Sequence, residues 1–144
     1  MKRLSAMAGL LFALFLAPLW SNAMDSITTA DVIAIREAVE AQLHALSNDD
    51  ASSAFELATQ EKRMLIGSPD NFLRIIKEQY DPIYHYQSVI FSRAEVVDGN
   101  PIQIVRVADE DGKVWVAVFW MQQEEDSRWK IDGCQLFETS SVST

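Results

Sequence analysis

Lys113–Glu138, KVWVAVFWMQQEEDSRWKIDGCQLFE, is the stretch around which the rest of this chain is arranged. Val114 to Met121 is an unbroken run of β-branched and other apolar residues, rich in aromatics, which is typical of a strand buried on both faces. Glu124–Ser127 then offers a polar turn, and the apolar pattern resumes at Trp129 on a second strand. The stretch therefore predicts a β-hairpin that is covered by segments from upstream in the chain.

The other strands precede this hairpin. The period of the apolar residues changes to two after Ile83, so Tyr84–Val97 is predicted as a long strand and Ile102–Ala108 as a second one. Asp109–Gly112 has the composition of a tight hairpin turn. On the last strand the apolar positions shift from odd to even numbers beside Gly133, which predicts a β-bulge that bends the strand.

Three helices are predicted before the strands. The first starts near Thr28 and ends at Ser47–Asp50, and its apolar positions share one face. These positions are Val32, Ile35, Val39, Leu43 and Leu46. A second, shorter helix is expected over residues 51–58. The third has Ser68 as its N-cap with a proline in its first turn, and it is expected to end before Pro82. The pattern predicts an α+β domain with three N-terminal helices packed on a bent four-stranded antiparallel sheet.

The N-terminus has the features of an export signal. A positive Met1–Arg3 is followed by an apolar run to Leu19, and Ser21–Ala23 places small residues before a cleavage site. A retained membrane anchor is the alternative, but the run is short for a span of about 20 apolar residues. We therefore expect residues 1–23 to be a signal peptide, 24–138 one domain, and 139–144 a flexible tail, in a periplasmic or secreted protein.

Charge and composition narrow the function classes. The net charge is −9, and cleavage after Ala23 would make it −11, so we expect neither nucleic acid nor, after cleavage, a membrane as partner. Cys134 is the only cysteine, so no intramolecular disulfide is expected, and we interpret it as a small core residue. Two histidines and one cysteine make a zinc site improbable. No metal and no cofactor is predicted.

Three motifs carry a resemblance. GSPDNFL (Gly67–Leu73), DPIY (Asp81–Tyr84) and WKIDGC (Trp129–Cys134) are similar to an uncharacterised bacterial family of exported proteins, labelled as a domain of unknown function, over about Asp31–Glu138. The resemblance implies a cone-shaped α+β roll of the nuclear-transport-factor-two-like or cystatin-like kind. It implies no activity, because folds of this kind host isomerases, dehydratases and many non-catalytic modules.

Candidate catalytic residues are few. His85 lies beside the expected mouth of the cone and would need an orienting carboxylate, for which Asp81 is nearest in sequence. Tyr84 and Asp132 are the other candidates for proton transfer, and a substrate would stack against Trp120. This hypothesis describes a small-molecule isomerase or dehydratase. The alternative for His85 is a strand histidine that faces solvent or stacks between tyrosines.

Aromatic residues gather in the C-terminal half and favour a second hypothesis, an exported non-catalytic module that binds a small apolar ligand or a protein partner. The residues expected to bind a ligand are Tyr80, Tyr84, Tyr86, Arg106 and Trp120. Arg106 would meet an anionic group or pair with a carboxylate at the rim. If the second face of the sheet is also apolar, it would make a homodimer or hold a ligand. Otherwise Trp115 and Trp120 simply fill one core.

Overall fold

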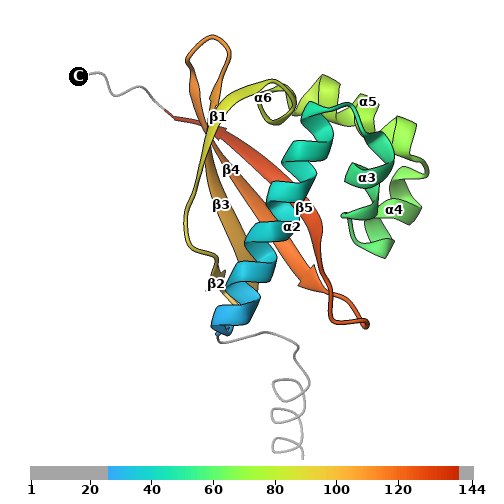
Figure 1. The fold of residues 1–144 in the computed structure, drawn as a ribbon, viewed down its shortest axis with the longest axis vertical. Coiled ribbons are helices and arrows are strands. Elements are labelled where there is room, and N and C mark those ends of the chain that lie inside the picture. The colour runs from blue at the N-terminus through green and yellow to red at the C-terminus, as the bar shows by residue number, and fades with distance from the viewer. Residues whose placement is uncertain (1–25, 140–144) are drawn as a thin grey trace, which may run out of the picture.

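A computed structural model of the chain describes residues 26–139, which form one layer of helices on one sheet (Figure 1). The helices in this range are α2 (Thr29–Ser47), α3 (Ala51–Glu56), α4 (Gln60–Ile66), α5 (Pro69–Gln79) and α6 (Asp81–Tyr84). The strands are β1 (Tyr86–Phe91), β2 (Glu95–Val97), β3 (Asn100–Asp109), β4 (Val114–Gln123) and β5 (Trp129–Glu138). The sheet is antiparallel in the order β1-β3-β4-β5, and β2 pairs with β3. The predicted α+β class is confirmed, whereas the expected signal peptide and most of the tail lie outside the described residues.

Helix α2 forms where the capping residues predict it. The side chain of Thr28 accepts a hydrogen bond from the Asp31 backbone N–H at 3.0 Å, and the Asp31 carboxylate accepts one from the Thr28 N–H at 3.2 Å. The latter bond is the largest reason why the pKa of Asp31 is lowered. Asp31 also accepts a hydrogen bond from the Trp129 indole at 3.2 Å, which joins the start of α2 to the start of β5. These contacts place the apolar face of α2 on the sheet (Figure 1).

The two faces of the sheet differ in burial. On the face beneath α2, Val105, Ala117 and Phe119 are fully buried. On the opposite face, which we call the outer face, Val118 and Trp120 are only partly buried. No helix of residues 26–139 covers the outer face (Figure 1). The prediction that the β4 strand is buried on both sides is therefore wrong for this chain alone. An unbroken apolar run shows that both faces avoid charge, but it does not show what covers each of them.

The element count also differs from the prediction. Helices α4 and α6 are additional to the three predicted helices. The third helix, α5, ends at Gln79, before Pro82 as predicted, but the chain then forms α6 from Asp81 instead of starting the strand, because a proline fits the first turn of a helix. The long strand predicted over residues 84–97 is instead the end of α6 followed by β1 and β2, with a break at residues 92–94. At the break the Gln103 side chain donates to the Ser92 carbonyl at 2.6 Å, in the space beneath α2.

The predicted turn and bulge are both present. The Asp109 carboxylate accepts hydrogen bonds from the backbone N–H groups of Asp111 and Lys113, each at 2.9 Å, and closes the hairpin turn. On β5, Gly133 pairs with Trp120 and Ile131 pairs with Met121, so the residue between them has no partner on β4. That residue is Asp132, and the bulge turns its side chain toward the helices rather than along the sheet.

The free edge of β5 is closed by the link between α3 and α4. The Ile131 N–H donates to the Leu57 carbonyl at 2.8 Å, and the Thr59 N–H donates to the Ile131 carbonyl at 3.0 Å. This pairing is parallel and spans a single bridge at Ala58. It attaches the α3–α5 helices to the edge of the sheet at the bulge.

Within residues 26–139, no helix combines the length and the apolar character that crossing a membrane requires.

Candidate functional site

A pocket of about 180 Å³ lies between helices α4 and α5 and the bulged part of β5. Its walls are chiefly apolar, with Ile66 from α4, Ile75 and Ile76 from α5, and Ile131 and Cys134 from β5. Pockets that bind small molecules are typically concave and apolar with a few polar groups that orient the ligand. This pocket is therefore the candidate functional site.

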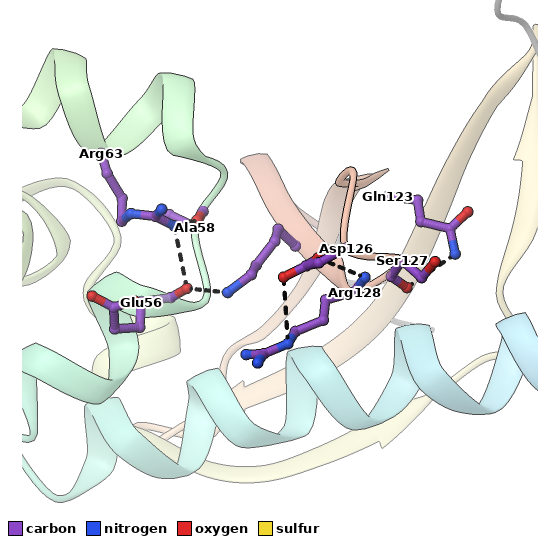
Figure 2. A network of polar contacts seen from close by, with 8 residues as sticks. Glu56, Ala58, Arg63, Gln123, Asp126, Ser127 and Arg128 are labelled. Atoms are coloured by element: carbon purple, nitrogen blue, oxygen red, sulfur yellow. Dashed lines mark hydrogen bonds and ion pairs between the residues drawn. The ribbon is translucent and has the colours of Figure 1, made fainter.

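The pocket exists because backbone groups hold α3 and α4 beside the bulge. The Lys130 ammonium donates to the Glu56 carbonyl at 2.7 Å, which joins the end of α3 to β5. The Arg63 guanidinium donates to the Glu56 carbonyl at 3.4 Å and to the Ala58 carbonyl, so α4 is tied to the same link (Figure 2). With both ends of the link held, α4 stands away from the sheet, and none of its residues is buried. The space between α4 and β5 remains open as the pocket.

One end of the pocket is polar. The Thr59 hydroxyl donates to Oδ1 of Asp132 at 2.9 Å, and Nζ of Lys62 lies 4.0 Å from Oδ2 of the same carboxylate. Thr59 also caps α4, because its side chain accepts a hydrogen bond from the Lys62 N–H at 3.3 Å. An ion pair of this length and exposure contributes little to stability. The pair instead gives the pocket one acceptor and one donor at its rim.

Cys134 lies in the wall of the pocket, and burial raises the pKa of its thiol to about 12. The thiol is consequently protonated at neutral pH, which disfavours a role as a nucleophile. Because the folded-state pKa is raised, the protonated thiol stabilises the fold fully below the unfolded pKa near 9. That contribution is lost as the pH rises from 9 toward 12.

Alkylation of Cys134 by iodoacetamide at pH 8 is expected to be about 30–50-fold slower in the folded chain than in urea. A rise in pKa from 9 to about 12 lowers the thiolate fraction roughly a thousandfold, and the greater nucleophilicity of the more basic thiolate offsets part of this. Mass spectrometry of timed samples measures both rates. The chain has no other cysteine, so no second thiol confuses the result. Equal rates in the two states would contradict the burial of this thiol.

The other candidates for proton transfer lie outside the pocket. His85 follows α6 and is exposed, and its Nδ1 lies 2.8 Å from Oδ1 of Asp81, so the expected orienting carboxylate is present. Tyr84 donates to the Asp49 carboxylate, which raises the pKa of Tyr84. The structure thus brings Tyr84 and His85 together, with ring centroids 4.3 Å apart, but neither lines the pocket that contains Asp132.

The five side chains expected to bind a ligand do not share one cavity. Tyr80 lines the pocket, and Tyr84 is held at the surface by Asp49. Tyr86 opens β1 opposite Asp109, whereas Arg106 and Trp120 point to the outer face of the sheet. Lys62 and Ile66, both on α4, line the pocket but were not among the residues predicted from the sequence. Thr59 is a favourable N-cap residue and precedes a stretch with polar and apolar residues. This pattern could have predicted α4 and so revealed both residues.

Metal ligands do not gather in the described part of the chain. Among residues 26–139, no three His, Cys, Asp or Glu side chains lie close enough to hold a metal ion. The donor and acceptor at the pocket rim, Lys62 and Asp132, are a cation and an anion in one pair. Such a pair suits hydrogen bonding to a ligand better than it suits metal coordination.

Comparisons with known proteins give one match. No curated protein and no solved structure matches the chain. A family model described as a domain of unknown function (DUF4864) matches residues 28–144, a range that contains all the helices and strands given above. The match confirms the resemblance to an uncharacterised domain that the three sequence motifs indicated. This chain therefore belongs to the DUF4864 family of domains of unknown function.

Proposed function

We propose that this protein is an exported, non-catalytic binding module that holds a small apolar ligand in the pocket between α4, α5 and β5. The observation that carries the proposal is the volume of about 180 Å³ within mainly apolar walls. An engineered cavity of about 150 Å³ lined by Leu, Ile and Phe stays dry and binds benzene. A pocket of similar size and lining suits a single ring or a short branched chain.

The arrangement of titratable groups favours a module over an isomerase or dehydratase. Such an enzyme would need an acid and a base that converge on one substrate position. Asp132 lines the pocket, but the His85–Asp81 pair is exposed beside α6, and the thiol of Cys134 is protonated at neutral pH. The enzyme would be favoured instead by substrate turnover whose pH profile shows that His85 and Asp132 act as an acid–base pair.

Toluene is expected to bind in the pocket with a dissociation constant on the order of 0.1–1 mM, which is reasonable for seven heavy atoms. A titration followed by methyl NMR should shift the signals of Ile75, Ile76 and Ile131 in a saturable way. Ile75→Trp should abolish these shifts, because the indole fills the space. Ile90→Trp is the matched control, since Ile90 is 67% exposed on the outer face.

The titration can also fail in an informative way. Shifts that stay linear in toluene concentration, or that are equal in Ile75→Trp and in the wild-type chain, would overturn the proposed pocket.

The export part of the proposal has its own measurement. The intact mass of the chain purified from its own host should correspond to a protein that begins at Met24.

A second candidate function, self-association, is favoured by the outer face of the sheet. Ile90 and Phe137 are 67% and 51% exposed there, beside the partly buried Val116 and Val118. Arg106 lies between Ile90 and Val116 in one cross-strand row, so these apolar residues flank a single charge. Exposed apolar groups of this extent commonly mark interaction surfaces. Strands β3, β4 and β5 have ten residues each, and β1 and β2 both pair with β3, so the sheet presents a face of roughly 33 by 19 Å, or about 600 Å² in flat projection. The corrugated surface is larger, and a standard interface buries about 800 Å² per partner.

The charges on this face suit a second copy of the same chain. Arg106 is exposed on β3, and Glu95 of β2 pairs with Ile102 and so points to the same side. A two-fold interface brings the same patch together twice, so each charge can meet its opposite in the partner. We therefore propose a homodimer through the outer face, to be tested by sedimentation velocity.

A further inference from the structure

We propose that the pocket selects a neutral, ring-sized ligand that carries one hydroxyl group, and that this hydroxyl lies between Lys62 and Asp132. The inference rests on the proposed function, because it names the chemical class of the ligand for the same pocket. Its starting point is the gap of 4.0 Å between Nζ of Lys62 and Oδ2 of Asp132.

This gap is too long for a direct hydrogen bond and the right length for a bridge. Hydrogen bonds from an ammonium or a hydroxyl are about 2.7–3.0 Å long. If an oxygen atom lies about 2.8–2.9 Å from both Nζ and Oδ2, the angle Nζ···O···Oδ2 at that oxygen is roughly 90°, which a hydroxyl can adopt. The hydroxyl accepts from the Lys62 ammonium and donates to the Asp132 carboxylate, so it uses both of its hydrogen-bonding roles.

Thr59 holds the carboxylate of Asp132 and the backbone of Lys62 in place. This residue is 1% exposed, and its hydroxyl donates to Oδ1 of Asp132 at 2.9 Å, which leaves Oδ2 for a ligand. The same oxygen accepts from the Lys62 N–H and fixes the first turn of α4. Among residues 26–139, Asp132 carries the carboxylate that lies within ion-pair distance of Nζ of Lys62, at 4.0 Å. The acceptor is thus preorganised at the rim, and the Lys62 ammonium extends from the fixed first turn of α4 to within reach of the same ligand atom.

The charge at the rim favours a neutral ligand. Lys62 and Asp132 carry one charge of each sign, and their side chains are 37% and 33% exposed. A carboxylate in the gap would be repelled by Asp132, and an ammonium would be repelled by Lys62. A purely apolar molecule would leave the gap unfilled and gain nothing from the pair. A ring with one hydroxyl satisfies the pair at the rim and fills the apolar wall formed by Phe72, Ile76 and Ile131.

Phenol and toluene test this inference because they differ by one hydroxyl in place of a methyl group. Burying an unpaired hydroxyl is costly, so an apolar pocket without a polar partner would bind toluene more tightly. We expect phenol to bind about tenfold more tightly than toluene in titrations followed by methyl NMR. We expect benzoate and benzylamine each to bind more weakly than phenol.

Substitutions at Lys62 and Asp132 test whether this pair causes the preference for phenol over toluene. In Lys62→Met/Asp132→Asn the affinity ratio of phenol to toluene should fall to one or below, while toluene binding stays within about twofold. Lys113→Met is the matched control, because Lys113 pairs with Glu138 at the far end of the sheet from this rim, and it should keep the tenfold preference. Toluene that binds as well as phenol, or a preference that survives the double substitution, would overturn the hydroxyl assignment and leave the apolar pocket standing. Tighter binding of benzoate or benzylamine would overturn the neutral ligand, and no saturable binding of any of the four molecules would overturn the proposed function itself.

Discussion

Phe119→Ala is expected to lower the free energy of unfolding by about 3–5 kcal/mol, which is the usual cost of truncating a buried aromatic residue. Phe119 is 0% exposed on β4, on the face beneath α2, and pairs across the sheet with Gln103 and Cys134. The truncation removes apolar surface from the core and leaves a cavity that the fully buried neighbours cannot close. A domain of this size has about 5–15 kcal/mol of stability in total, so the variant should lie close to its unfolding threshold.

Urea denaturation followed by tryptophan fluorescence measures this loss. Val118→Ala is the matched control, because it changes the next residue of the same strand on the partly exposed outer face. We expect it to cost less than about 1 kcal/mol at low micromolar concentration, where a dimer would dissociate. Similar losses in the two variants would contradict the assignment of β4 to one buried and one outer face.

Val118→Lys is expected to weaken the proposed homodimer by at least about a hundredfold. Val118 pairs with Ile104 and Gln135 near the middle of the outer face, so a lysine there would place an ammonium inside an apolar interface. A buried charge without a partner costs several kcal/mol, and two such charges would face each other in a two-fold dimer. The monomer should remain folded, because a lysine on an exposed sheet face can extend its ammonium into water.

Sedimentation velocity between about 1 and 100 μM gives the oligomeric state of both chains. Ile33→Lys serves as the control, since Ile33 is 53% exposed on α2, away from the outer face. It should leave the distribution of species unchanged. A wild-type chain that stays monomeric over this range, or a Val118→Lys variant that dimerises as the wild type does, would remove the outer face as a self-association surface.

Local chemistry explains which elements could be predicted. The caps at Thr28 and Ser68 and the turn at Asp109–Gly112 each depend on residues three or four positions apart, and all three are present. The bulge at Asp132 was visible in the change of apolar parity along β5. The end of α5 before Pro82 was also predicted, whereas α6 was missed, because a proline that disfavours helix before it also suits the first turn of a new helix.

The α+β class, the capped start of α2, the hairpin turns and the bulge could all be predicted from the residues alone, because each follows from neighbouring residues and from apolar periodicity. The uncovered outer face and the pocket at the bulge, in contrast, depend on how distant elements pack together. The contact that orders its rim, Thr59 with Asp132, joins residues 73 positions apart, and nothing in the local pattern of either residue specifies the other. A cavity is the space that packed elements leave between them, so its size and its lining arise only when α4, α5 and β5 meet.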